Sequence, residues 1–139
     1  MRDDVSILLV DDDEVDVMSV QRAFKKINIT NPLYVANDGL EALALLRGEG
    51  GQEPIRPNII LLDLNMPRMG GLEFLEALRA DDELKSISVV VLTTSDEETD
   101  RVKAFNHHVA GYIVKPVTSS KFVEAMATFN RYWTLTSLP

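Results

Sequence analysis

The sequence predicts an α/β domain built around a parallel sheet, in which five strands alternate with five helices. Short apolar runs alternate with segments of helical spacing along all 139 residues. Two of the runs are continuously apolar, which is typical of parallel strands covered on both faces. Strands and helices that alternate in this way favour a sheet connected by right-handed crossovers.

The strands are expected at the five apolar runs of the chain. These runs are "SILLV" (6–10), "LYVA" (33–36), "NIILLD" (58–63), "SVVVLT" (88–93) and "GYIV" (111–114). The Gly- and Pro-rich loop 47–58 enters the third strand at its N-terminal end. Because doubly wound sheets bind ligands at the carboxyl ends of their strands, this loop is expected at the opposite edge.

The helices are expected where apolar residues recur every three or four positions. The second helix begins at "DGLEAL", where Asp38 is placed to cap it. The faces of the other helices are marked by Val17, Val20, Phe24 and Ile27 in the first, by Leu72, Leu75 and Leu78 in the third, which begins at Gly71, by Val102 and Phe105 in the fourth (about 97–107), and by Phe122, Met126, Phe129 and Trp133 in the last.

The composition and net charge argue against several classes of function. The net charge of -8 and the pI near 4.7 argue against sequence-independent binding of nucleic acid. No apolar run approaches the roughly 20 residues of a membrane span, and the N-terminus lacks the apolar stretch of a signal peptide. With no cysteine, disulfides and thiolate metal sites are excluded. We expect one cytoplasmic domain over 1–139, with a core at about 5–133, a tail at 134–139 and no output domain.

Polar residues follow four of the five predicted strands. They are Asp11–Asp13, Asp63, Thr93–Ser95 and Lys115–Pro116. The central strands of a doubly wound sheet are neighbours, so these residues are expected in one crevice. Carboxylate oxygens suit a hard cation such as Mg²⁺. His107 and His108 are placed inside the fourth helix, away from this edge, and are not expected to bind the metal.

The charges expected in this crevice would suit a phosphoryl group bound to Asp63. A phosphoryl group on Asp63 would add roughly -1.5 to -2 charge, and a cation, the Lys115 ammonium and the Thr93 hydroxyl are what this anion would need. Each residue also has a plainer interpretation: an aspartate at a strand end is most often a helix cap, and Thr93 or Lys115 alone could be a strand or surface residue. For Asp13 we favour the helix cap over an effect on the metal.

The chain resembles the receiver domain of two-component response regulators over essentially its whole length, and it is similar in extent to the single-domain chemotaxis regulator. The matching motifs are "ILLVDDD", "IILLDLNMPRMGG", "VVVLTTS" and "GYIVKPV". The resemblance implies a flavodoxin-like fold with strand order 2-1-3-4-5. It also implies a signalling phosphoacceptor rather than an enzyme, with only self-phosphorylation and autodephosphorylation activity.

The resemblance assigns roles to the acidic residues. Asp63 is similar to the phosphoacceptor aspartate, which receives its phosphoryl group from a sensor histidine kinase. Asp11 and Asp12 resemble the family's acidic pair, in which Asp12 would bind Mg²⁺ or Mn²⁺ directly and Asp11 through water. The backbone carbonyl of Asn65 would complete the metal site together with Asp63.

The resemblance also identifies the residues that would respond to the phosphoryl group. Thr93 would reorient toward it, Tyr112 would swing inward, and Lys115 would pair with a phosphoryl oxygen. Pro116 resembles the family's cis-proline, whereas Tyr112 is also explained as strand packing. Thr94 departs from the small residue that is usual there, so its bulk could narrow access and lengthen the lifetime of the phosphoryl group.

Weaker features suggest a subgroup and an output. Three features resemble those of single-domain regulators that partner phytochrome-type histidine kinases. They are the 47–58 loop, "FNHHVAGYI" and "RYWTLTSLP". After the fifth strand only one helix and a short tail remain, so the output would be a surface change, dimerisation or onward transfer of the phosphoryl group between kinases. The exposed apolar residues expected at a homodimer interface are Phe129, Tyr132, Trp133 and Leu135.

Three other functions are disfavoured. An aspartate-nucleophile phosphatase needs a second acid two residues after its nucleophile, where this chain has Asn65. A flavin-binding electron carrier would place phosphate beside Asp11–Asp13, which would repel it. An unphosphorylated scaffold has no support, because every expected site position is filled.

Overall fold

A five-stranded parallel sheet in the order β2-β1-β3-β4-β5 forms the centre of the protein. The structure is a computed structural model, and it describes residues 5–103 and 107–127. The strands are β1 (Ile7–Val10), β2 (Leu33–Ala36), β3 (Ile59–Asp63), β4 (Ser88–Thr93) and β5 (Gly111–Val114). The strand order, the parallel pairing and the flavodoxin-like fold predicted from the resemblance are confirmed.

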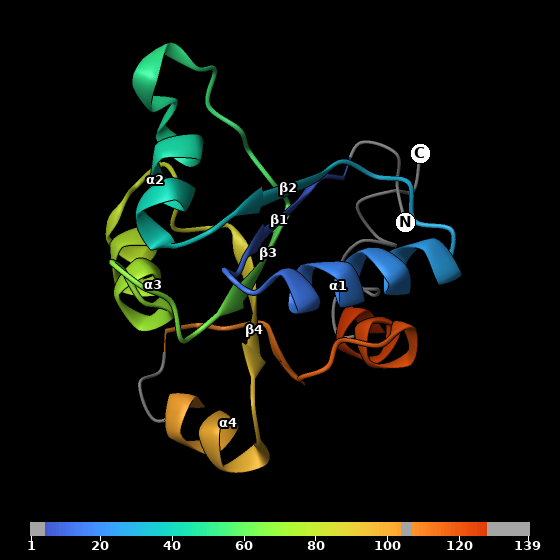
Figure 1. Cartoon of the computed structure of the whole chain (residues 1–139). Helices are drawn as coiled ribbons and strands as arrows, with labels where there is room; N and C mark the ends of the chain where they lie inside the picture. The colour runs from blue at the N-terminus through green and yellow to red at the C-terminus, as the bar shows by residue number, and fades with distance from the viewer. Residues whose placement is uncertain (1–4, 104–106, 128–139) are drawn as a thin grey trace.

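Helices cover both faces of this sheet (Figure 1). They are α1 (Glu14–Lys26), α2 (Gly39–Arg47), α3 (Gly71–Ala80), α4 (Asp96–Lys103) and a helical segment at 119–127. A short 3-10 helix, η1 (Glu49–Gly51), lies within the loop 47–58. Within the described residues, no helix is both long and apolar enough to cross a membrane.

Alternate strand residues build two separate apolar layers. Ile7 and Leu9 of β1 pack with α1 and with residues 119–127, where the Phe24 and Phe122 ring centroids lie 4.7 Å apart. Leu8 and Val10 of the same strand pack instead with α2 and α3. Because successive side chains point to opposite faces, a continuously apolar strand supplies both layers.

The predicted helix starts are confirmed. Asp13 caps α1 by accepting a hydrogen bond from the Val15 N–H at 2.8 Å. Asp38 caps α2 by accepting one from the Glu41 N–H at 2.9 Å. The loop 47–58 rejoins the sheet where the Asn58 N–H donates to the Ser6 carbonyl, just before β1. It therefore meets the sheet at the end opposite the carboxyl ends of the strands, as expected.

The prediction for the fourth helix was wrong at its C-terminal side. His107 and His108 do not lie in a helix: α4 is described to Lys103, and residues 107–110 have no regular structure. The guanidinium of Arg79 on α3 donates to the carbonyls of His107 and His108, at 2.9 and 3.1 Å. A side chain of a neighbouring helix thus satisfies the backbone oxygens of this irregular segment.

Gly71, the first residue of α3, allows the helix to start directly against β3. A Cβ atom added there would lie 2.5 Å from the Asp63 carbonyl oxygen and 2.7 Å from the Leu64 Cα. At the neighbouring Gly70, the nearest atom to an added Cβ would be the Leu64 carbonyl oxygen at 3.4 Å. The backbone that carries Asp63 therefore depends on the missing side chain of Gly71.

We predict that Gly71→Ala lowers the free energy of unfolding by about 1–3 kcal/mol, because the two atoms nearest to the added methyl group belong to rigid backbone. Gly70→Ala is the matched control and should cost less than about 1 kcal/mol. Urea denaturation followed by circular dichroism measures both values. Equal losses in the two variants would contradict the prediction.

Candidate functional site

The carboxyl ends of β1, β3, β4 and β5 bring the predicted site residues together. Asp11 follows β1 and Asp63 ends β3, and these strands are paired so that Val10 lies beside Leu62. Thr93 ends β4, and Lys115 follows β5, whose Val114 is paired with Thr93. Four segments that are distant in sequence therefore meet at one edge of the sheet, as the sequence predicted.

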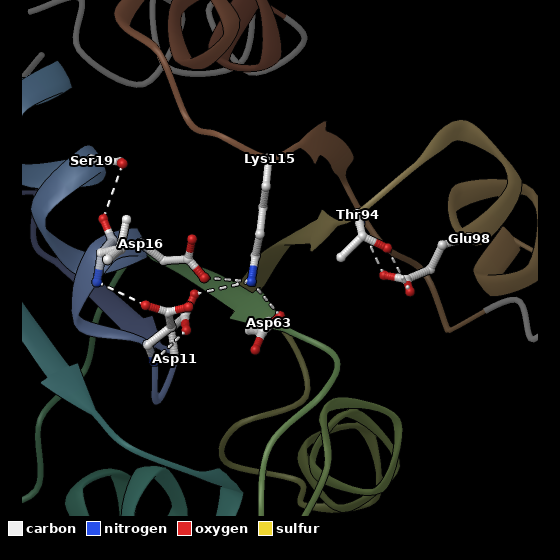
Figure 2. A network of polar contacts seen from close by, with 9 residues as sticks. Asp11, Asp16, Ser19, Asp63, Thr94, Glu98 and Lys115 are labelled. Atoms are coloured by element: carbon white, nitrogen blue, oxygen red, sulfur yellow. Dashed lines mark hydrogen bonds and ion pairs between the residues drawn. The ribbon is translucent and has the colours of Figure 1, made fainter.

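The Lys115 ammonium is surrounded by carboxylates (Figure 2). Its Nζ donates to Asp63 Oδ1 at 2.8 Å and to Asp16 Oδ2 at 2.6 Å. Asp11 Oδ2 lies 3.5 Å from the same nitrogen. The ion pairs are well shielded, since the side chains of Lys115 and Asp16 are only 17% and 16% exposed.

Asp11, Asp12 and Asp63 form an acidic group suited to a cation. Each offers a carboxylate oxygen, and the three oxygens lie within 4.8 Å of one another. Asp11 and Asp63 are buried and Asp12 is exposed. Asp11 Oδ2 is buried and has no hydrogen-bond partner among the residues that the structure describes. An all-oxygen group that includes a buried acceptor without a hydrogen bond fits Mg²⁺ or Mn²⁺.

Burial and neighbouring charges shift the pKa values of Asp11, Asp63 and Lys115. Burial raises the pKa of Asp11 to about 7, against an opposing hydrogen bond from the Asp13 N–H. Burial also raises the pKa of Asp63, although Lys115 and the Asn65 N–H act in the other direction. Burial alone would lower the pKa of Lys115, but its bonds to Asp16 and Asp63 outweigh this effect and raise the pKa. Burial thus disfavours the ionised forms of Asp11 and Asp63, and the neighbouring Lys115 ammonium favours them.

The two threonines after β4 are bonded to α4. The buried Thr93 hydroxyl lies 2.8 Å from the Thr99 Oγ1, which itself donates to the Ser95 carbonyl. The Thr94 hydroxyl and N–H donate to the Glu98 carboxylate at 3.1 and 3.2 Å. Thr94 and Glu98 stand apart from the group around Lys115 (Figure 2). The hydroxyls of both threonines are therefore engaged by the first turn of α4.

The remaining predicted site residues lie around this group. Asn65 is exposed on the loop after β3, and its N–H bonds the Asp63 carboxylate. Tyr112 is half-buried on β5 against the α2–α3 layer, with Lys103 Nζ 5.4 Å from its ring centroid. The peptide bond between Lys115 and Pro116 is cis, as predicted. Phe129, Tyr132, Trp133 and Leu135 lie outside the described residues.

An ion pair between Arg68 and Asp38 anchors the loop that follows Asp63. Arg68, which has a φ of 62°, donates from Nε to Asp38 Oδ2 at 2.7 Å, and its Nη2 lies 2.6 Å from the same oxygen. The Asp38 side chain is only 4% exposed. In addition, the Gly39 N–H donates to the Met69 carbonyl. The start of α2 therefore holds the loop that leads from Asp63 to α3.

Sequence reasoning missed Asp16, Glu98 and Thr99. Asp16 lies in the first turn of the helix after β1, and that position close to the strand ends could have marked it. Glu98 and Thr99 are buried residues of α4. No apolar spacing singles them out, because their roles come from contacts with the turn after β4.

Comparisons with known proteins agree with this arrangement. The family model described as "Response regulator receiver domain" matches residues 7–127. Response regulator Rcp1 of Synechocystis sp. is 38% identical over 128 residues, which cover 91% of this chain and 87% of Rcp1.

Solved structures of response regulators are also similar to this chain. The bacteriophytochrome response regulator RtBRR is 42% identical with a TM-score of 0.84, over 89% of this chain and 76% of that one. The Mn²⁺-bound form of Rcp1 is 37% identical with a TM-score of 0.75, over 97% of this chain and 99% of that one.

We predict that Asp11→Asn stabilises the metal-free protein increasingly as the pH rises. The folded state keeps a proton on Asp11 up to about pH 7, whereas the unfolded chain releases it near pH 4. Wild-type stability is therefore lost between these values as the pH rises. Relative to wild type, the variant should gain roughly 2–3 kcal/mol between pH 5 and 8.

Urea denaturation in the presence of a chelator, at half-unit pH intervals, measures this gain. Glu14→Gln removes an exposed carboxylate from α1 and controls for the loss of one negative charge. A difference between wild type and Asp11→Asn that stays constant with pH would show that the burial of Asp11 has no such effect.

Proposed function

This chain belongs to the response regulator receiver family of two-component systems, and from that premise we propose that Asp63 accepts a phosphoryl group from a sensor histidine kinase. The observation that carries the proposal is the position of the Asp63 carboxylate. One of its oxygens accepts a hydrogen bond from the Lys115 ammonium, and one of its oxygens lies within 4.8 Å of carboxylate oxygens of Asp11 and Asp12, at the carboxyl edge of the sheet. A buried carboxylate that has both a cationic partner and neighbouring carboxylates able to hold a cation suits transfer to an aspartate nucleophile.

The transfer is an in-line displacement. An oxygen of Asp63 forms a bond to phosphorus while the bond between phosphorus and the histidine nitrogen of the donor breaks. The electron pair of that bond stays on the nitrogen, which takes up a proton from solvent. Lys115, already 2.8 Å from Asp63 Oδ1, neutralises charge on the transferred group.

Asp11, Asp12 and Asp63 would hold Mg²⁺ or Mn²⁺, with the Asn65 carbonyl as a further ligand. Receiver domains bind divalent metal, and the related Rcp1 has a Mn²⁺-bound structure. When bound, the metal neutralises phosphoryl oxygens and orients the displacement. Without it, the carboxylates around Lys115 would repel an incoming dianion.

The threonines and Tyr112 are the proposed response to phosphorylation. Thr93 would exchange its bond with Thr99 for one with the phosphoryl group, and Tyr112 would follow inward. Thr94 is bonded to Glu98 in the resting protein, so the same movement would have to release it from α4. The signal would then leave the domain as a change in the surface around α4 and β5.

A phytochrome-type histidine kinase is the proposed donor. The support comes from the likeness to RtBRR, a bacteriophytochrome response regulator. A phosphoryl shuttle between kinases uses the same Asp63 chemistry and is the second candidate. A phosphotransfer assay with phytochrome kinases and with histidine phosphotransfer proteins distinguishes the two.

We predict that the protein gains the mass of one phosphoryl group when incubated with Mg²⁺ and acetyl phosphate. Asp63→Asn or an excess of chelator should abolish the gain, because the nucleophile or the cation is then missing. Asp82→Asn, which removes an exposed aspartate before β4, is the control and should behave like wild type. Intact-protein mass spectrometry provides the measurement, and an equal gain in Asp63→Asn would refute the assignment.

We further propose a homodimer that involves the apolar residues near the C-terminus. The support is sequence alone: aromatic and aliphatic residues lie close together in the sequence at Phe129, Tyr132, Trp133 and Leu135. We predict that Trp133→Ala shifts the protein from dimer to monomer in light scattering across a concentration series. The dimer proposal fails if wild type and variant have the same mass at every concentration.

A further inference from the structure

Asp16 is the second short carboxylate partner of Lys115. Its Oδ2 lies 2.6 Å from the ammonium nitrogen, compared with 2.8 Å for Asp63 Oδ1. Asp16 comes from the first turn of α1, 99 positions before Lys115 in the chain. The site thus contains a carboxylate that touches the Lys115 ammonium and that has no role in the proposed phosphoacceptor function.

Asp16 stands outside the cation-binding group. The carboxylates whose oxygens lie within 4.8 Å of one another are those of Asp11, Asp12 and Asp63. Within the described part of the chain, the contact of the Asp16 carboxylate is with Lys115. Figure 2 shows the Asp16 side chain extending from α1 toward the lysine nitrogen. Its contact therefore points to an effect on Lys115 rather than to binding of the metal.

Two consequences follow for a phosphoryl group on Asp63. First, Lys115 must share its donors between Asp16 and the new anion, because Asp16 already holds one of them. Second, Asp16 Oδ2 and Asp63 Oδ1 both lie within 2.8 Å of the same nitrogen, so a dianion on Asp63 would be close to the Asp16 charge. In a partly shielded site this repulsion is stronger than in bulk water. Both effects favour the resting protein.

We propose that Asp16 is a positioning residue that holds Lys115 in its resting place and thereby weakens the binding of a phosphoryl group at Asp63. The inference rests on the proposed phosphoacceptor function. Lys115 already contacts Asp63 in the resting protein. To direct all of its donors to the phosphoryl group, it must break its hydrogen bond with Asp16. The start of α1 is consequently coupled to the state of the site.

Beryllium fluoride, a non-covalent mimic of the phosphoryl group, tests the proposal without a chemical step. Its half-saturating concentration is measured by calorimetry at saturating Mg²⁺, with the Mg²⁺ affinity of each variant determined first. Asp16→Asn should bind beryllium fluoride about three- to tenfold more tightly than wild type. Asp16→Glu keeps the carboxylate and should return the affinity to near the wild-type value.

Glu14→Gln removes an exposed carboxylate at the first residue of the same helix and should stay within about twofold of wild type. Thermal melts check that all variants are folded. Unchanged or weaker binding in Asp16→Asn would overturn the proposal, as would equal tightening in Glu14→Gln. If wild type itself binds no beryllium fluoride and gains no phosphoryl mass, the proposed function fails instead, so the two failures are distinguishable.

Discussion

One ammonium group stabilises the acidic edge of this protein. Lys115 contacts Asp11 and Asp16, which lie close together at the junction of β1 and α1, and Asp63, which ends β3. Isolated carboxylates are costly to bury, and removing one partner of a buried pair leaves an uncompensated charge. The lysine therefore makes it possible for the sheet to end in carboxylates, and the proposed phosphoryl transfer depends on it.

The surrounding backbone keeps these groups in place. Gly71 lets α3 begin against the backbone of Asp63, and Arg68 fastens the intervening loop to the N-terminus of α2 through Asp38. Neither residue touches Lys115 in the described contacts. Both act by restricting the segment that carries Asp63, and such restriction is what the proposed in-line transfer to this residue would require.

Two helices, α1 and α4, contact the site or the turn beside it through different residues. α1 meets it through the charge of Asp16, while α4 meets the turn after β4 through Glu98 and Thr99. An anion on Asp63 would compete for Lys115 on one side and for the Thr93 hydroxyl on the other. A change of charge at Asp63 would thus alter hydrogen bonds made by both α1 and α4 without a large rearrangement of the sheet.

The sequence by itself determined the alternation of strands and helices, because apolar runs and helical spacing are local patterns. It also identified Asp11, Asp63, Thr93 and Lys115, since parallel strands bring their carboxyl ends to one edge. It failed at the end of α4, where the carbonyls of His107 and His108 are bonded by Arg79 rather than by a continuing helix. Only the tertiary structure decided that Asp16 shares Lys115 and that Glu98 and Thr99 engage the threonines. Such pairings depend on how helices pack beside the strand ends, and no spacing within a single segment encodes that distance.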